Sequence, residues 1–261
     1  MRRVSPLDIF MRALGPLCGG LLALAAAVAA LPAGAQDREA FIAGTTKECP
    51  GCDLAGLSFK RRNLAGANLA GANLEEATFH RTTLRGANLR EANLAYANLN
   101  RADLTNANLQ GADLTGAMLV AADAAAANFT GAKLQMALMG DVRLIRAILE
   151  NANLTGADLG GGRLTDAKLA NAILTRADLR DTAMFRVDLR GAVIEEAYMP
   201  NAALRGANLQ GAVLRGANLE AADLGAADLT GANLDSAHLV GTNFQDAVLT
   251  DARLPGNTTL R

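Results

Sequence analysis

The sequence predicts an all-β solenoid, a coil that repeats one short structural unit along most of the chain. From Leu54 to Leu254 every fifth residue is apolar without a change of phase, and 32 of these 41 positions are leucine. Alanine stands two residues before 32 of the same 41 positions. Aromatic residues make up only 3% of the 261 residues, although 51% are hydrophobic. This pattern indicates a repeat architecture rather than a domain with an aromatic-lined pocket.

A five-residue period excludes the ordinary secondary structures. In an α-helix five residues rotate about 500°, so successive leucines would spiral around the axis and form no apolar stripe. In a flat strand an odd step would send alternate leucines to opposite faces. The chain must therefore bend once in every five residues.

Each unit divides into an extended segment and a turn. The residue before the central leucine is Asn or Asp in 22 of the 41 units, and it points away from the Ala and Leu that flank it. Two residues remain for a turn, and glycine is common at the second, as at Gly66, Gly71 and Gly206, where it tolerates a positive φ. We therefore expect a coil with short sides, Leu and Ala inside and polar residues outside.

The repeated motif A-[DN]-L-x-x resembles that of the pentapeptide-repeat family. Residues 112–116 (ADLTG) and 157–161 (ADLGG) match it closely, and the pattern covers about 205 residues. The resemblance implies a right-handed quadrilateral parallel β-helix with four pentapeptides per coil. It further implies about ten coils over residues 53–256, roughly 48 Å in length at ~4.8 Å per coil, with a C-terminal tail at 257–261.

Residues 20 apart are then expected to lie above one another on adjacent coils. Phe59 and Phe79 should stack in this way. The stretches 118–149 and 173–203 depart furthest from the consensus but keep its phase. We expect them to be altered surface rather than loops.

Residues 1–35 have the features of a cleaved signal peptide. Arginines occupy positions 2, 3 and 12, residues 13–31 are almost wholly apolar or small, and residues 33–35 (AGA) have the pattern of a cleavage site. The mature chain would begin at Gln36 in the periplasm, or in a lumenal or extracellular compartment, without stable membrane insertion. An uncleaved anchor is the alternative, since 19 apolar residues nearly span a bilayer. The first two arginines leave both the general and the twin-arginine export routes open.

The segment 36–52 is expected to close the N-terminal end of the coil, with a short helix over Asp37–Thr46. Cys49 and Cys52 form a Cys-x-x-Cys pair that runs directly into the first repeat. Redox motifs of this type begin a helix in a βαβ setting, which is missing here. An oxidising compartment favours a structural disulfide that pins the entrance to the first coil, and redox activity is the alternative. Some exported members of the family look similar at this point.

The sequence does not support catalysis, and we expect a non-enzymatic protein without cofactor or metal. The histidines, His80 and His238, would be separated by about eight coils, or roughly 38 Å, so they cannot share a site in one chain. No phosphate-binding loop, dinucleotide fingerprint or zinc-ligand spacing occurs in the sequence. The net charge is −1, and −3 after removal of residues 1–35, which does not favour a nucleic-acid partner.

The 20-residue register predicts a ladder of basic side chains on one face. Its members are Lys60, Arg61, His80, Arg81 and Arg101. Like charges about 4.8 Å apart repel one another, so such a ladder indicates an anionic partner such as a polysaccharide, a phosphate or an acidic protein. A solvated face without a partner is the alternative, because the long side chains can splay apart.

Two further features indicate contacts. Ile173, Val193 and Val213 should form an outward apolar ladder, which is either a β-favouring surface or a contact patch for a partner or a second copy. No helix is expected over the C-terminal end near Leu254. That open coil edge is either blunted by Pro255 or covered by a homodimer formed through this end.

These features predict an exported non-enzymatic scaffold that binds an unknown protein or anionic ligand through its outer faces. The resemblance also implies an alternative, a DNA-mimic protein that binds a topoisomerase. That role needs a cytoplasmic location and a strongly acidic face, whereas the acidic residues here are scattered. A structural rod of the cell envelope is a further alternative.

Overall fold

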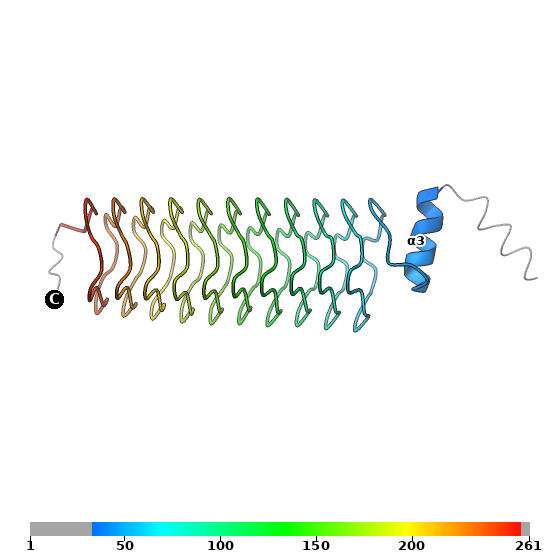
Figure 1. The fold of residues 1–261 in the computed structure, drawn as a ribbon, viewed down its shortest axis with the longest axis horizontal. Coiled ribbons are helices and arrows are strands. Elements are labelled where there is room, and N and C mark those ends of the chain that lie inside the picture. Colours follow the sequence, from blue (N-terminus) through cyan, green and yellow to red (C-terminus); the bar gives the residue numbers. More distant parts are fainter. Residues whose placement is uncertain (1–32, 257–261) are drawn as a thin grey trace, which may run out of the picture.

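The computed structural model describes residues 33–256, which form one helix followed by a long rod (Figure 1). Helix α3 (Ala33–Ala43) lies at the N-terminal end, and the chain then winds along the rod to the other end. The helix begins and ends a few residues earlier than the predicted Asp37–Thr46. The predicted signal peptide lies outside the described residues, except that its last three residues begin α3.

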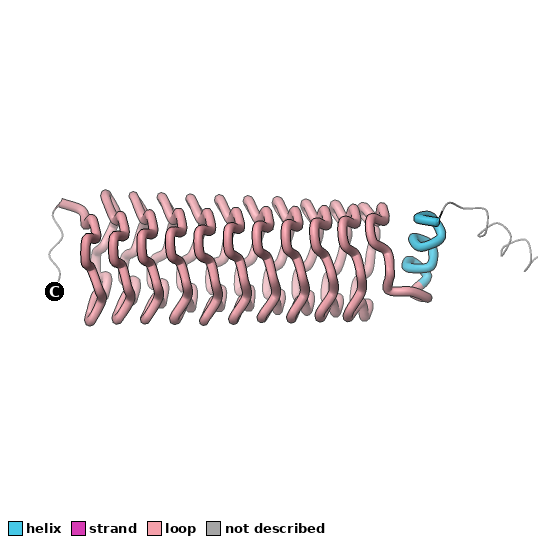
Figure 2. Tube along the Cα trace, turned by 45° about the horizontal axis from the view of Figure 1, so that its top comes forward, coloured by secondary structure: helices cyan, strands magenta, loops and turns pink. Residues whose placement is uncertain are grey.

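The winding repeats every 20 residues. Parallel β-bridges join each outward residue to the one 20 positions later, from Glu48 with Asn68 to Asn233 with Arg253. Backbone hydrogen bonds follow the same register, and the Leu54 N–H donates to the Asn73 carbonyl on the next coil at 2.8 Å. Four five-residue sides therefore complete one coil, and every coil is hydrogen-bonded to its neighbours (Figure 2).

The sides of the coil are shorter than ordinary strands. Each side contributes one bridged residue, because a turn follows every extended segment. Two sides matter for function. The Phe59 side has central residues 59, 79, 99 and every twentieth residue thereafter, and the Leu54 side has central residues 54, 74, 94 and so on.

The interior is filled by the residues that the period places inside. Leu154 and Ala152 have no exposed surface, whereas Asn153 between them points outwards and is half-buried. Phe59 and Phe79 stack with ring centroids 5.3 Å apart and planes at 17°, which confirms the predicted stack. Burial of each leucine contributes about 1.5–3 kcal/mol, repeated along the whole rod.

The turns impose one backbone conformation on glycine and on other residues alike. In the turn after Leu64, the Ala67 N–H donates to the Leu64 carbonyl at 3.0 Å, and Gly66 has a φ of 68°. Where the sequence lacks glycine, the same position still has a φ between 53° and 60°. None of these residues is β-branched, as expected for a left-handed conformation in which a Cβ is strained.

Helix α3 packs on the first coil through aromatic and charged contacts. Phe41 is fully buried, and its ring meets Phe59 edge-to-face with centroids 5.6 Å apart. Arg62 lies over the Phe59 ring and donates to the carbonyls of Phe41 and Ile42 at 3.3 and 3.0 Å. These carbonyls belong to the last turn of the helix, where the Gly44 N–H also donates to the Phe41 carbonyl at 3.0 Å, and a cation at a helix C-terminus is favourable.

The opposite end of the rod is less covered. The last central residues, Leu239, Phe244, Leu249 and Leu254, are only partly buried. Within residues 33–256 no further coil or helix lies beyond them. The described end therefore exposes apolar surface that the central coils bury.

The strained turns yield a stability prediction. Ala126 has a φ of 55° and an exposed side chain, so Ala126→Gly removes strain without removing a packed group. We expect the free energy of unfolding to rise by about 1 kcal/mol in denaturant titrations. The matched control is Ala127→Gly, an inward position with no exposed surface, which should lower stability. Equal destabilisation by both substitutions would contradict the strain argument.

Candidate functional site

Candidate sites lie on the outside of the rod, because leucine and alanine fill the inward positions. The structure brings the five residues of the predicted basic ladder together at the corner that follows the Phe59 side. Lys60, Arg61, Arg81 and Arg101 are exposed and His80 is half-buried. Burial lowers the pKa of His80, and the positive charges of Arg81, Arg101, Lys60 and Arg61 lower it further. The ladder therefore produces a locally positive potential.

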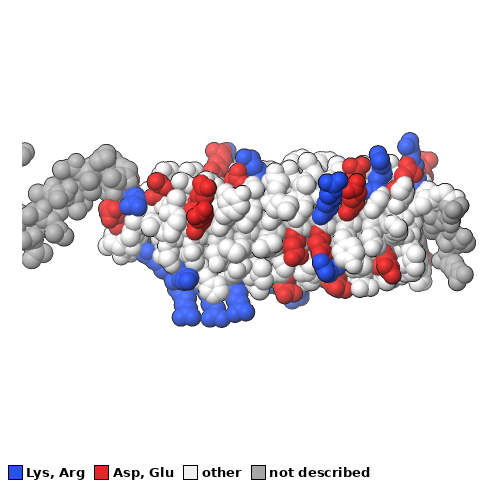
Figure 3. Space-filling view, turned by 180° about the vertical axis from the view of Figure 1, so that it is seen from behind, with Lys and Arg blue, Asp and Glu red and all other residues white. Residues whose placement is uncertain are grey.

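The basic ladder is a row of neighbouring basic side chains without an acidic partner. Ten other arginines and lysines among residues 33–256 pair with carboxylates, often on an adjacent coil, as in Arg143–Asp123 at 2.8 Å and Arg186–Asp166 at 2.7 Å, whereas some, such as Arg146 and Arg205, do not. Among residues 33–256, no member of the basic ladder forms an ion pair. Figure 3 shows basic side chains projecting in a row from one edge of the N-terminal part of the rod.

The predicted apolar ladder is continuous but only partly exposed. Ile173 bridges Val193, and Val193 bridges Val213, so the three side chains stack on the Leu54 side. Ile173 is 39% exposed, whereas the two valines are half-buried. The limited exposure of these three side chains is compatible with the ordinary preference of β-branched residues for β-structure.

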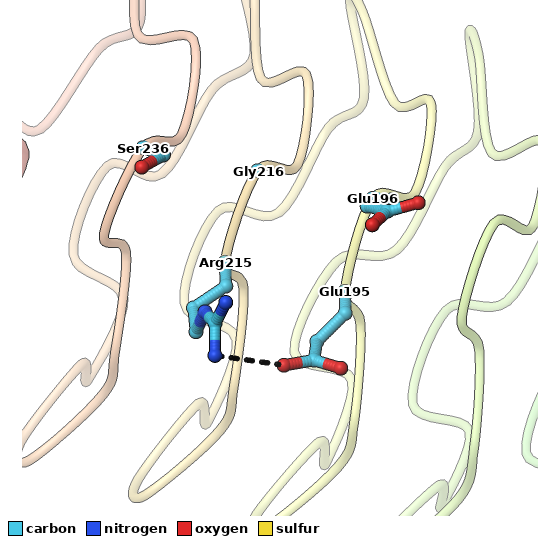
Figure 4. Close-up of a pocket in the computed structure, with 5 residues that line it drawn as sticks. All are labelled: Glu195, Glu196, Arg215, Gly216 and Ser236. Carbon is cyan, nitrogen blue, oxygen red and sulfur yellow. Dashed lines mark ion pairs between the residues drawn. The ribbon is translucent and has the colours of Figure 1, made fainter.

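A shallow hollow of about 280 Å³ lies beside the apolar ladder (Figure 4). It is lined by Glu195, Glu196, Arg215, Gly216 and Ser236. The Arg215 guanidinium lies 4.0 Å from the Glu195 carboxylate, and Glu196 accepts a bond from Arg176 at 2.7 Å. Its charges are thus already matched within the chain, and it offers no unpaired group to a ligand.

A second hollow, of about 430 Å³, lies on the Phe59 side and was not expected from the sequence. Three glycines, Gly140, Gly160 and Gly161, leave bare backbone there. Asp141, Asp158, Arg180 and Asp181 complete the lining, and we call the whole set the glycine hollow. Arg180 is paired with Asp178, which raises the pKa of the guanidinium, and stacks on the Tyr198 ring at 5.4 Å. None of the three lining aspartates forms an ion pair within residues 33–256.

An exposed apolar patch separates the basic ladder from the glycine hollow. It consists of Tyr96, Met118, Val120, Met136 and Leu138, of which all but Met118 are at least 38% exposed. The sequence prediction of altered surface over 118–149 included four of these five residues but missed Tyr96. The signal in the sequence that indicates such exposure, and that was overlooked, is a glycine 20 residues later, on the next coil. Gly116 leaves room for the Tyr96 ring and Gly156 for the Met136 sulfur, each within 2.6 Å of where a Cβ would lie.

The residues considered for catalysis occupy structural positions. Cys49 and Cys52 form a disulfide, and both are buried at inward positions of the repeat. His80 and His238 lie far apart along the register. In the part of the chain that the structure describes, no cluster of His, Cys, Asp and Glu is placed to hold a metal ion. Helices long and apolar enough to cross a membrane are not found among the same residues.

A family model described as pentapeptide repeats matches the sequence in eight copies. The matched residues are 51–90, 84–120, 125–161, 163–199, 188–225 and 227–256. This match supports the right-handed β-helix that the motif implied. A comparison with curated proteins returned no match.

Several solved structures resemble the chain. HetL, a pentapeptide repeat protein involved in heterocyst differentiation regulation in Nostoc sp. strain PCC 7120, is 30% identical over 86% of this chain and 98% of its own, with a TM-score of 0.46. QnrB1, a plasmid-mediated fluoroquinolone resistance protein, is 19% identical over 75% and 88% of the two chains, with a TM-score of 0.34. A pentapeptide repeat protein from the Arabidopsis thaliana thylakoid lumen is 26% identical over 54% and 70%, with a TM-score of 0.19.

The environment of His80 yields a prediction for the basic ladder. Because the protonated form is disfavoured in the folded chain, His80 stays neutral to a lower pH than an ordinary histidine, and its protonation lowers stability as the pH falls. Arg81→Ala should raise the His80 pKa, measured by NMR titration of the imidazole. Arg205→Ala removes an exposed arginine elsewhere and should leave this pKa unchanged. An unchanged pKa in Arg81→Ala would show that the ladder exerts no field on His80.

Proposed function

The chain belongs to the pentapeptide-repeat family, and from this premise we propose that it is a non-enzymatic scaffold that binds an acidic partner through the outer surface of its rod. The observation that carries the proposal is the basic ladder, whose exposed cations have no acidic partner in the described chain. A rod with a filled core has no cleft in which to perturb a catalytic group, so binding is the function that its surface supports.

The proposed architecture is a rod of about ten coils with distinct ends. Helix α3 acts as the cap of the N-terminal end, since its Phe41 packs on the Phe59 ring of the first coil. Arg62 of that coil donates to the carbonyls of Phe41 and Ile42 at the end of the helix. At the other end, partly exposed residues such as Phe244 and Leu254 leave a homodimer through this end as an alternative contact. A terminal repeat without a polar cover is a liability in any solenoid.

The proposed location is an exported compartment, with the periplasm as the first choice. The basic and apolar pattern of residues 1–35 supports export, and the Cys49–Cys52 disulfide is of the kind that persists in oxidising compartments. Cleavage after Ala35 would leave most of α3 attached to the rod.

The topoisomerase-binding alternative receives little support from this surface. A DNA mimic presents an extended acidic face, whereas many of the acidic side chains here are paired with arginines on the same or an adjacent coil. The longest row of unpaired charge is positive rather than negative.

The function proposal predicts salt-sensitive binding to polyanions. Wild-type protein should bind heparin and poly-L-glutamate at low ionic strength, and Arg61→Ala/Arg81→Ala/Arg101→Ala should weaken binding by at least ~10-fold. Arg143→Ala/Arg186→Ala/Arg190→Ala removes the same net charge from paired arginines and should retain most of the affinity. Equal losses in the two triple variants, measured by titration calorimetry, would contradict a specific role for the ladder.

The location proposal predicts processing at a defined bond. Full-length protein produced in a bacterium and recovered from the periplasmic fraction should have Gln36 as its first residue in intact-mass measurements. Ala35→Phe should block cleavage, because signal peptidases require a small residue there, and should retain the chain at the membrane. Unprocessed wild-type protein in the cytoplasm would overturn the export proposal.

A further inference from the structure

The Phe59 side carries three surface features in a fixed order along the rod. The basic ladder lies nearest the N-terminus, the apolar patch follows, and the glycine hollow with its carboxylates comes next. Figure 3 shows the basic side chains that project from one edge towards the N-terminal end, and a mixture of acidic and basic side chains farther along the rod. Each feature is incomplete by itself, since it consists of unpaired cations, exposed apolar atoms or unpaired carboxylates.

The apolar patch is concentrated rather than scattered. Nine large hydrophobic residues are exposed among those described, and Tyr96, Val120, Met136 and Leu138 of the patch are four of them, with Met136 65% exposed. Met118 bridges Leu138, so the patch is continuous across adjacent coils. Contiguous exposed apolar surface between charged borders is typical of a protein–protein contact.

The charges on either side of the patch are complementary to one another. Arg81 and Arg101 precede it and Asp158 and Asp181 follow it, and all four lack an ion pair within the described residues. They are several coils apart, so they cannot meet within one rod. A second rod in the opposite direction would bring each set against the other.

We propose that the chain self-associates side by side and antiparallel through the Phe59 side. The two-fold axis lies perpendicular to the rod, between the coils of Met118 and Leu138. A two-fold axis in this place brings the same surface of both copies together, as isologous dimers require. The inference rests on the proposed function and names the acidic partner of the basic ladder as a second copy of this chain.

This two-fold axis sets each coil of one copy opposite one particular coil of the other copy. Met118 lies against Leu138 of the partner subunit, so the two apolar patches cover each other. Arg101 faces the partner subunit's glycine hollow, where the side chains of Asp158 and Arg180 lie over Gly160 and that of Asp141 lies over Gly161. A long cationic side chain thus meets a hollow whose lining holds three aspartates and one arginine, which is the charge complementarity that an interface uses.

The outer coils of the contact are matched in charge at both corners. Arg81 faces the partner subunit's Asp181 at one corner. At the corner before the Phe59 side, the exposed Glu76 faces the partner subunit's Arg176. In a parallel pair, with the two-fold axis along the rod, Arg81 would instead lie opposite Glu76 of the partner subunit, and the charge-reversal experiment distinguishes the two arrangements. A polyanion would neutralise the basic ladder but leave the patch and carboxylates exposed, so a second copy is the better fit.

A charge-reversal experiment tests the register on the full chain by sedimentation velocity. Wild-type protein should dimerise, and Arg81→Asp or Asp181→Arg alone should each weaken the dimer at least ~10-fold, because each places like charges together. The double variant Arg81→Asp/Asp181→Arg should recover affinity to within a few-fold of wild type. Arg205→Asp, at an exposed unpaired arginine outside the contact, is the matched control and should have no effect. Single and double variants that all dimerise like wild type would overturn the proposal.

Two more variants separate this contact from other modes of association. Leu138→Glu should abolish the dimer while Val240→Glu, at a 72% exposed residue far from the axis, should preserve it. Arg81→Cys/Asp181→Cys should form disulfide-linked dimers under oxidising conditions, whereas neither single variant should. Dimers that survive Leu138→Glu but are lost in Leu254→Glu would place the contact at the C-terminal end and overturn the proposal.

The tests also distinguish this inference from the function on which it rests. A monomeric wild-type protein that still binds poly-L-glutamate through the basic ladder would overturn self-association and leave the scaffold function standing. A protein that neither dimerises nor binds a polyanion would remove both.

Discussion

The structure depends on one constraint, the return of the chain to the same place every 20 residues. That return stacks each central leucine on another and pairs each backbone group with a neighbouring coil, so burial and hydrogen bonding are satisfied by the same geometry. The turn that closes each side must adopt a positive φ, and it does so even where Arg81 or Ala126 replaces glycine. Local strain of this kind persists because the coils above and below over-determine the backbone.

The same constraint moves function to the surface. With leucine and alanine filling the inside, no interior cleft is available to desolvate a catalytic group or enclose a substrate. The outward and corner residues vary freely. Because residues 20 apart lie on adjacent coils, side chains that recur at this spacing form ladders on the surface. Some charges in these ladders are neutralised across adjacent coils, as in Arg186–Asp166. The basic ladder and the aspartates of the glycine hollow gather like charges without an ion pair among residues 33–256, so they are the informative part of the surface.

Much of the fold and part of the candidate site could be predicted from spacing. The Phe59–Phe79 stack and the gathering of Arg61, Arg81 and Arg101 follow from the 20-residue register that the family resemblance implies. The Cys49–Cys52 disulfide follows from the Cys-x-x-Cys pair and the expected oxidising compartment. The exposed Tyr96 and the glycine hollow could not be found in this way. Their exposure depends on which residue lies on the next coil, so Tyr96 has to be considered together with Gly116, 20 residues later, rather than with its own repeat.

The sequence by itself determined the coil, because a five-residue apolar period is compatible with neither helix nor flat strand and leaves one way to bury its leucines. Together with the four-sided coil that the family resemblance implies, it also determined which residues share a ladder. Only the tertiary structure decided which of these side chains are unpaired, which lie flat over a neighbouring glycine, and how α3 meets the first coil through Phe41 and Arg62. These properties depend on rotamers and neighbours across coils, and the repeat period does not specify them.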